Sequence, residues 1–202
     1  QPGMVYLSFP TEVGTIYSLA ELQAIREVCN QYSLWLFIDG ARLGYGLCSP
    51  VCDVTLPQLA DLADVFYIGG TKVGALFGEA VVITTGALKR DFRYSIKRHG
   101  GMLAKGRLLG IQFETLFSDG LYFEIARRAV AQALRIKETL QAKGFRLMVD
   151  SPTNQQFVIL PNEILDQLSQ HFVLSPWEPL EGNLTAVRIC TSWATRDENV
   201  DT

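Results

Sequence analysis

Histidine, basic charge and long apolar runs are all scarce in this sequence, and each shortage excludes a class of protein. There are two histidines and four irregularly spaced cysteines, which is too few ligands in the wrong pattern for a zinc site, so no metal site is predicted. The formal net charge of −3 provides no positive field for nucleic acid. No segment approaches the roughly 18 uninterrupted apolar residues of a membrane span. We therefore expect a cytoplasmic globular protein with reduced thiols and with neither nucleic acid nor membrane as a partner.

Both ends of the sequence are abrupt. The chain starts on Gln1 without an initiator Met and enters an apolar strand at once. Near the other end, Thr195 and Glu198 form a capping-box pattern that no apolar helix continues. These features predict a fragment of a longer protein that lacks the N-terminal part.

The first half of the sequence has the pattern of an α/β domain. A capping box at Ser18 and Glu21 opens a predicted helix that runs to about Gln31. The near-continuous apolar run Leu34–Ile38 is typical of a strand buried on both faces of a parallel sheet. The other expected elements here are the strands Met4–Phe9, Val65–Ile68 and Ala80–Thr84 and the helix Leu56–Leu62. This order predicts a mostly parallel sheet, with Ala80–Thr84 antiparallel because it follows too closely for a helical crossover.

The second half changes character and predicts a smaller α+β lobe. Leu103–Lys143 is long and helical with a break around Ser118-Asp119-Gly120, and Gly182-Asn183 has the composition of a turn. The remaining expected elements are the strands Phe145–Val149, Phe157–Leu160 and Ala186–Cys190 and the helix Glu163–His171. We expect residues 1–115 to belong to a large domain and residues 116–202 to form a small C-terminal domain.

Two polar residues directly follow predicted buried strands. Asp39 follows Leu34–Ile38, and Lys72 ends the sequence Gly69-Gly70-Thr71-Lys72 after Val65–Ile68. Open α/β folds bind ligands at the carboxyl ends of their strands. A partly desolvated Asp39 there needs a cation such as a protonated pyridine nitrogen, and desolvation of Lys72 favours the neutral amine that attacks an aldehyde. Taken singly, Asp39 also fits a turn cap and Lys72 fits a surface lysine.

A third candidate lies far downstream. Arg188 stands among strong strand formers in Val187-Arg188-Ile189-Cys190-Thr191-Ser192. Its guanidinium is suited to a bidentate hydrogen-bonded contact with a carboxylate. Taken alone, Arg188 equally fits an arginine exposed to solvent on an edge strand.

Taken together, these residues resemble a known family. The segment Asp39-Gly40-Ala41-Arg42, with Lys72 placed 33 residues after Asp39, is similar to the threonine aldolase and β-eliminating lyase group of fold-type I pyridoxal-phosphate (PLP) enzymes. The family pattern is Leu-Asp-Gly-Ala-Arg and, further along, Ser-Lys-Gly. His99-Gly100-Gly101-Met102 resembles its Gly-Gly-Met element, and Arg188–Ser192 resembles its C-terminal carboxylate-binding strand.

The resemblance implies a role for each matching residue. Lys72 would hold PLP as a Schiff base, and Asp39 would pair with the ring nitrogen and keep it protonated. Arg42 would lie beside the ring and help to hold the cofactor or the substrate carboxylate, which Arg188 would bind. Thr71 would lie near the phosphate. The family also implies a homodimer or homotetramer.

The sequence departs from the family pattern in three places. Val73 stands where the family has Gly after the lysine, and Leu103 follows Met102 where the aldolases have an Arg. Thr11-Glu12 follows the first strand where Glu-Asn-Thr is frequent, and its role stays open. No phosphate loop or ring-stacking residue precedes Asp39, so we expect the 202-residue chain alone to bind PLP weakly or not at all.

The resemblance favours a PLP-dependent lyase that cleaves a β-hydroxy-α-amino acid to glycine and an aldehyde. The same scaffold also fits β-elimination or transamination of another amino acid. A non-catalytic α/β binding protein, with Asp39 and Lys72 in structural roles, is the alternative from a different class. No general base stands out in the sequence.

Overall fold

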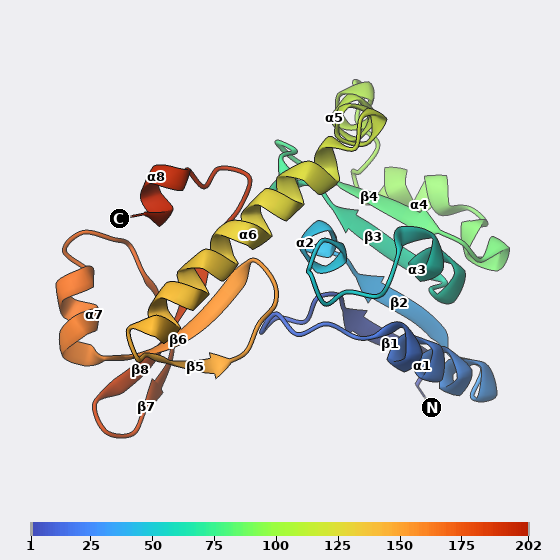
Figure 1. Cartoon of the computed structure of the whole chain (residues 1–202). Coiled ribbons are helices and arrows are strands. Elements are labelled where there is room, and N and C mark those ends of the chain that lie inside the picture. Colours follow the sequence, from blue (N-terminus) through green and yellow to red (C-terminus); the bar gives the residue numbers. More distant parts are fainter. Residues whose placement is uncertain (1, 202) are drawn as a thin grey trace.

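A computed structural model describes residues 2–201, which form two lobes joined by a long helix (Figure 1). The elements of the first lobe are β1 (Met4–Ser8), α1 (Leu19–Gln31), β2 (Trp35–Asp39), α2 (Leu43–Leu47), α3 (Leu56–Leu62), β3 (Val65–Gly69), the 3-10 helix η1 (Thr71–Val73), β4 (Glu79–Ile83), the 3-10 helix η2 (Gly86–Lys89), α4 (Phe92–Arg98) and α5 (Arg107–Ser118). The connecting helix and second lobe comprise α6 (Leu121–Ala142), β5 (Arg146–Val149), β6 (Gln155–Pro161), α7 (Asn162–Leu168), β7 (Ser175–Leu180), β8 (Leu184–Cys190) and α8 (Asp197–Val200). Among these described residues, none of the helices has the length and apolar content needed to cross a bilayer.

The first sheet has the order β1-β2-β3-β4. Strands β1, β2 and β3 are parallel to one another, and β4 returns antiparallel to β3 with Gly69 opposite Glu79. The mostly parallel sheet and its antiparallel β4 are therefore confirmed. The predicted capping box is also present, because the Ser18 hydroxyl oxygen accepts from the Glu21 amide and the Glu21 carboxylate accepts from the Ser18 amide.

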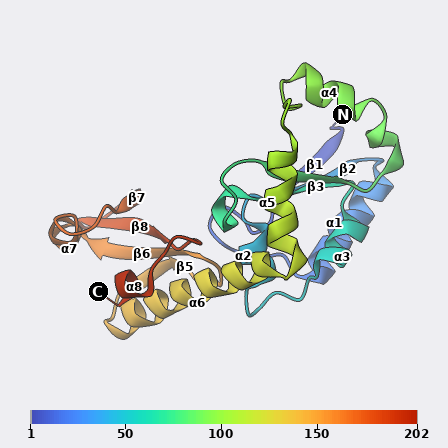
Figure 2. The ribbon, with the colours of Figure 1, turned by 90° about the horizontal axis from the view of Figure 1, so that it is seen from above.

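One face of this sheet carries the main hydrophobic core. Leu36, Ile38 and Phe66 point into it and pack with apolar side chains of α1, α2, α3 and the start of α6. Seen from above, α1 and α3 lie on the same side of the sheet (Figure 2). On the opposite face, Tyr6 and Trp35 are exposed. The expectation that the second strand is buried on both faces is therefore wrong for the described residues: alternate side chains of β2 meet the core and the open face.

The second sheet is antiparallel, with the order β5-β6-β8-β7, and has its own small core around Val158, Leu160 and Val187. Strand β7 is not among the strands predicted from the sequence. It contains Pro176 and Pro179, which are disfavoured in a central strand, and it lies at the edge of the sheet. The hairpin between β7 and β8 turns at Gly182 and Asn183, as predicted, with φ of 77° and 60°.

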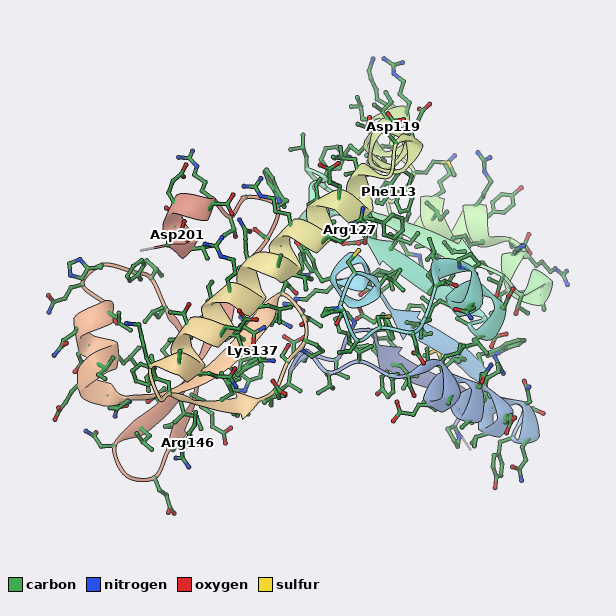
Figure 3. The ribbon with its side chains drawn as sticks, in the orientation of Figure 1. Phe113, Asp119, Arg127, Lys137, Arg146 and Asp201 are labelled. Carbon is green, nitrogen blue, oxygen red and sulfur yellow. The ribbon has the colours of Figure 1, made fainter. Side chains whose placement is uncertain are left out.

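Helix α6 connects the lobes. The predicted break before it lies at Gly120, whose φ is 72°. Arg127 and Lys137 on α6 lie beside different lobes (Figure 3): Arg127 lies near Cys48, whereas the Lys137 ammonium donates to the Ser151 carbonyl at 3.3 Å. Because α6 contributes to the core of the first lobe and also packs on the second sheet, the domain division after residue 115 stays a prediction.

Helix α8 starts one residue later than the C-terminal capping-box pattern predicts, because its N-cap is Arg196 and not Thr195. Thr195 accepts a hydrogen bond from the Ser192 amide instead, and α8 begins after Arg196 without a side-chain cap. The Thr195 hydroxyl thus closes a local turn with Ser192. Threonine side chains often form such local backbone hydrogen bonds in place of a helix cap.

Candidate active site

The two candidate segments for cofactor chemistry meet at the carboxyl edge of the first sheet. Asp39 is the last residue of β2, and Lys72 lies in η1 directly after the neighbouring parallel strand β3. Glycines allow the backbones to approach each other here. A Cβ atom on Gly40 would lie 1.9 Å from the Tyr67 carbonyl oxygen, and one on Gly69 would lie 2.3 Å from that of Ala41. The sequence therefore uses glycine at both positions because no side chain fits.

The Asp39 carboxylate is well supplied with hydrogen-bond donors. Its Oδ1 accepts from the Ala41 amide at 2.9 Å, and its Oδ2 accepts from the Tyr6 hydroxyl. Burial raises the pKa of Asp39, but hydrogen bonds from Tyr6, Tyr67 and the Ala41 amide outweigh burial and place the pKa below its ordinary value. The side chain is therefore an anion at neutral pH, as an aspartate that binds a cation must be.

Lys72 is held by a turn that differs from the family pattern. The Tyr45 hydroxyl donates to the Lys72 carbonyl, and the chain reverses at Gly74, whose φ is 107°. Val73 is buried. The glycine that permits the left-handed turn thus comes two residues after the lysine, not directly after it. Thr71 is exposed at the start of η1.

Lys72 lies within electrostatic range of two carboxylates, Asp39 and Glu79. The sequence places Glu79 at some distance along the chain, but β4 brings it back opposite Gly69. Burial raises the pKa of Glu79 above its ordinary value. Two smaller effects lower this pKa: the Gly70 amide donates to Glu79 Oε2 at 2.9 Å, and the Lys72 ammonium favours the ionised carboxylate.

The two candidate arginines come from different lobes. Arg42 is the residue that precedes α2, and Arg188 lies on β8 of the second sheet. Both contact Glu12: Arg42 Nη1 lies 3.4 Å from Glu12 Oε2, and Arg188 Nη1 lies 3.4 Å from Glu12 Oε1. Glu12, Arg42 and Asp39 also line one small cavity of about 50 Å³. The structure therefore brings Asp39, Lys72, Arg42 and Arg188 to one region where the lobes meet.

The segment His99–Met102 follows α4 and is exposed. The His99 ring contacts the Ser95 carbonyl of its own helix at 2.9 Å. Its resemblance to the Gly-Gly-Met element is a matter of sequence alone.

Sequence reasoning missed the two tyrosines beside Asp39. Tyr6 on β1 stacks on Phe37 with ring centroids 5.2 Å apart, and Tyr67 on β3 lies 6.1 Å from Phe37 on the other side. All three aromatic rings lie on the open face of the sheet. Alternation along each strand carries this signal, because Tyr6, Phe37 and Tyr67 each share a face with Asp39 once the strands are placed in register.

The fold and the site together define a class. A mostly parallel sheet with an aspartate and a lysine at the ends of neighbouring strands, followed by a smaller antiparallel lobe, is the architecture of fold-type I PLP enzymes. The model of the beta-eliminating lyase family matches residues 1–163, and the chain belongs to this family.

Individual relatives agree with this assignment. The chain is 31% identical over 169 residues to a low specificity L-threonine aldolase of Pseudomonas aeruginosa, covering 83% of this chain and 49% of that protein. It is also similar to the solved threonine aldolase of Leishmania major, with 46% identity, a TM-score of 0.97 and coverage of 98% of this chain and 58% of that one. A serine palmitoyltransferase of Sphingomonas wittichii shares the fold alone, at 15% identity and a TM-score of 0.70, over 99% of this chain and 52% of that one. The chain thus spans about half the length of the curated relatives that it matches.

Proposed function

We propose that the protein is a PLP-dependent lyase that cleaves a β-hydroxy-α-amino acid such as threonine to glycine and an aldehyde. The observation that carries this proposal is the meeting of Asp39, Lys72 and the pair Arg42 and Arg188 where the two lobes join. The relatives described above, named threonine aldolases, support the substrate class.

The side chains present suit pyridoxal phosphate. The cofactor has a basic ring nitrogen and an aldehyde carbon, and these call for a carboxylate and an amine respectively. Asp39 supplies an anion whose pKa is held below its ordinary value, and Lys72 supplies an amine within electrostatic range of it. We propose that Thr71, at the start of η1, lies near the phosphate. When bound, PLP supplies an electron sink for the pair of electrons released as a bond to Cα breaks.

The residues of this chain would then act as follows. Lys72 would hold the cofactor through its aldehyde carbon, the position that the substrate amine also needs. Asp39 would keep a proton on the ring nitrogen. Arg42 and Arg188 bind the substrate carboxylate, which fixes the rotation about the Cα bonds so that the Cα–Cβ bond is the one that breaks. The β-hydroxyl proton would pass to water as the aldehyde forms, and Cα would take a proton from water to give glycine.

Cofactor binding by the whole gene product tests the first half of this proposal. We expect a cofactor absorption band at about 420 nm, lost in Lys72→Ala and kept in Lys97→Ala, which removes an exposed lysine of α4. A protein with no band, and with an activity that Lys72→Ala leaves unchanged, would instead be a non-catalytic α/β binding protein.

Product analysis tests the second half. Glycine and acetaldehyde from L-threonine are the expected products. Ammonia and pyruvate from serine or tyrosine would identify a β-eliminating enzyme, the activity after which the family is named, and a keto acid formed with transfer of the amine would identify an aminotransferase.

Assembly and location complete the proposal. We propose a homodimer or homotetramer, because Leu76, Phe77, Leu108 and Ile111 on the loop after η1 and on α5 are large apolar side chains exposed on this chain. Sedimentation equilibrium tests the oligomeric state.

We propose a cytoplasmic location, which the four free cysteines support.

A further inference from the structure

The loop between β1 and α1 joins the two lobes. On one side it continues directly from β1, and Thr11 and Thr15 close it through a backbone hydrogen bond of 2.9 Å. On the other side it contacts the second lobe through its carbonyls: the Gln155 side chain donates to Glu12 O at 3.0 Å, and Ser151 Oγ donates to Gly14 O at 3.3 Å. The main chain of the loop is therefore fixed with respect to both sheets.

The contact at Gly14 is tight. Its φ is 82°, and a Cβ atom there would lie 2.2 Å from Ser151 Oγ. Ser151 itself is fully buried. The close contact with Ser151 thus fixes the position of the loop backbone against the second lobe. The loop backbone in turn fixes the position of the Glu12 Cα atom, from which the side chain extends.

From that point Glu12 reaches an arginine of each lobe. Each carboxylate oxygen contacts a different guanidinium, at 3.4 Å in both cases. The side chain of Glu12 is 59% exposed, whereas those of Arg42 and Arg188 are 16% and 26% exposed. Two poorly solvated guanidiniums that converge would repel each other without an anion between them. Glu12 is that anion.

Glu12 leaves part of each guanidinium free. It contacts only the Nη1 atom of Arg42 and of Arg188. Arg188 is further held by the ring of Trp177, whose centroid lies 5.2 Å from the guanidinium carbon, and its buried Nε has no hydrogen-bond partner. A guanidinium has five N–H donors, so a second carboxylate can bind without displacing the first.

We propose that Glu12 is a positioning residue that holds Arg42 and Arg188 at one point, so that a single α-carboxylate of the substrate meets both. This inference rests on the proposed function and adds to it a residue that acts through the two arginines. Its charge balance also suits the substrate class: two guanidiniums and Glu12 leave one net positive charge for one carboxylate.

The sign of the effect separates positioning from simple electrostatics. Glu12→Gln removes a negative charge beside two cations, and charge alone then predicts tighter binding of an anion. Loss of positioning predicts weaker binding, because the two arginines no longer converge. Weaker binding of the carboxylate ligand, with binding of the plain amine unchanged, therefore indicates that the two arginines have lost their positions.

The experiment compares Glu12→Gln with Glu181→Gln, which removes an exposed glutamate at the β7–β8 turn, in the whole gene product loaded with cofactor. Calorimetry measures the dissociation constants for glycine and for ethanolamine, an amine of similar size without a carboxylate. We expect Glu12→Gln to weaken glycine binding about twofold to fivefold, the upper part of the range for exposed ion pairs, and to leave ethanolamine binding unchanged. KM for L-threonine should rise, whereas kcat should change by less than about twofold.

Glu12→Asp keeps the charge on a shorter side chain, and its glycine affinity should lie between those of wild type and Glu12→Gln. Glu181→Gln should change none of these values.

Four results would overturn the inference. If Glu12→Gln binds glycine as tightly as wild type, Glu12 does not position the arginines. If it binds glycine more tightly, Glu12 competes with the ligand carboxylate for them. An equal loss for glycine and ethanolamine would show a general structural role. Wild-type protein that binds cofactor but no glycine would overturn the proposed function and the inference together, whereas an unchanged variant beside an active wild type overturns the inference alone.

Discussion

The amide of Gly69 donates to the carbonyl of Gly40 at 2.9 Å, so the backbones that carry Asp39 and Lys72 touch directly. This bond continues the pairing of β2 and β3 past the last residues in strand register. The separation of the two candidate cofactor residues is therefore set by main chain and does not depend on a flexible side chain.

This contact predicts that Gly69→Ala destabilises the fold. The new Cβ would meet backbone atoms of Ala41, which cannot rotate away, so we expect a loss of about 1 to 3 kcal/mol or more in the free energy of unfolding. Gly110→Ala on α5 is the matched control: nothing lies within 4 Å of its Cβ position, and the better helix propensity of Ala should stabilise by up to about 1 kcal/mol. Urea denaturation measures both, and equal stability of the two variants would contradict the explanation.

Tyr6 should set the pH at which Asp39 loses its charge. The pKa of Asp39 lies below its ordinary value, so its charge is present at neutral pH and is lost only as the pH falls through that depressed value. Tyr6→Phe removes one of the donors that lower the pKa. We expect the acid limb of cofactor binding to move to higher pH in Tyr6→Phe and to stay in place in Tyr94→Phe, where the ring is exposed on α4. An unmoved acid limb in Tyr6→Phe would show that this bond does not control Asp39.

The ion pair of Asp64 and Arg26 should stabilise the opposite edge of the sheet. Asp64 Oδ2 accepts from Arg26 Nη1 and from the Leu36 amide, each at 2.7 Å, and Oδ1 accepts from Thr85 at 2.6 Å. Asp64→Asn leaves Arg26 without a counter-charge, and we expect a loss of about 2 to 4 kcal/mol. Asp61→Asn on the exposed side of α3 should cost little.

The effect of Asp64 should also depend on pH. Burial raises the pKa of Asp64, but its hydrogen bonds and Arg26 outweigh burial and lower it. Its stabilisation is therefore present above the ordinary aspartate pKa and lost as the pH falls through the lower folded value. Thermal melts should show wild type and Asp64→Asn converging in strongly acidic buffer, and a constant gap across the whole range would contradict this assignment.

Tyr122 should tie α6 to helix α2 and to the end of strand β3. Its buried hydroxyl accepts from the Gly44 amide at 3.1 Å and donates to the Gly69 carbonyl at 3.0 Å. Tyr122→Phe leaves both backbone groups without these partners, so we expect a loss of about 1 to 3 kcal/mol in unfolding free energy. Tyr32→Phe, at the exposed end of α1, is the control and should change stability by less than about 0.5 kcal/mol. Comparable losses in the two variants would show that the hydrogen bonds of the Tyr122 hydroxyl do not contribute to the free energy of unfolding.

Local chemistry in the sequence determined most of the first lobe and the identity of the candidate site. The capping box at Ser18 and the strand before Asp39 depend on neighbouring residues, so they can be predicted without knowledge of the rest of the chain. Placing Asp39 and Lys72 at one sheet edge needs only the rule that parallel strands share their carboxyl ends. The family resemblance added the roles of Arg42 and Arg188.

Tertiary structure alone decided which groups surround those residues. Tyr6 reaches Asp39 only because β1 pairs with β2 in a particular register, and Glu79 approaches Lys72 only because β4 returns antiparallel. Glu12 lies far from Arg188 in the sequence, and no local pattern predicts that one carboxylate contacts an arginine of each lobe. Such contacts depend on strand register and on how two lobes dock, which are properties of the folded chain as a whole.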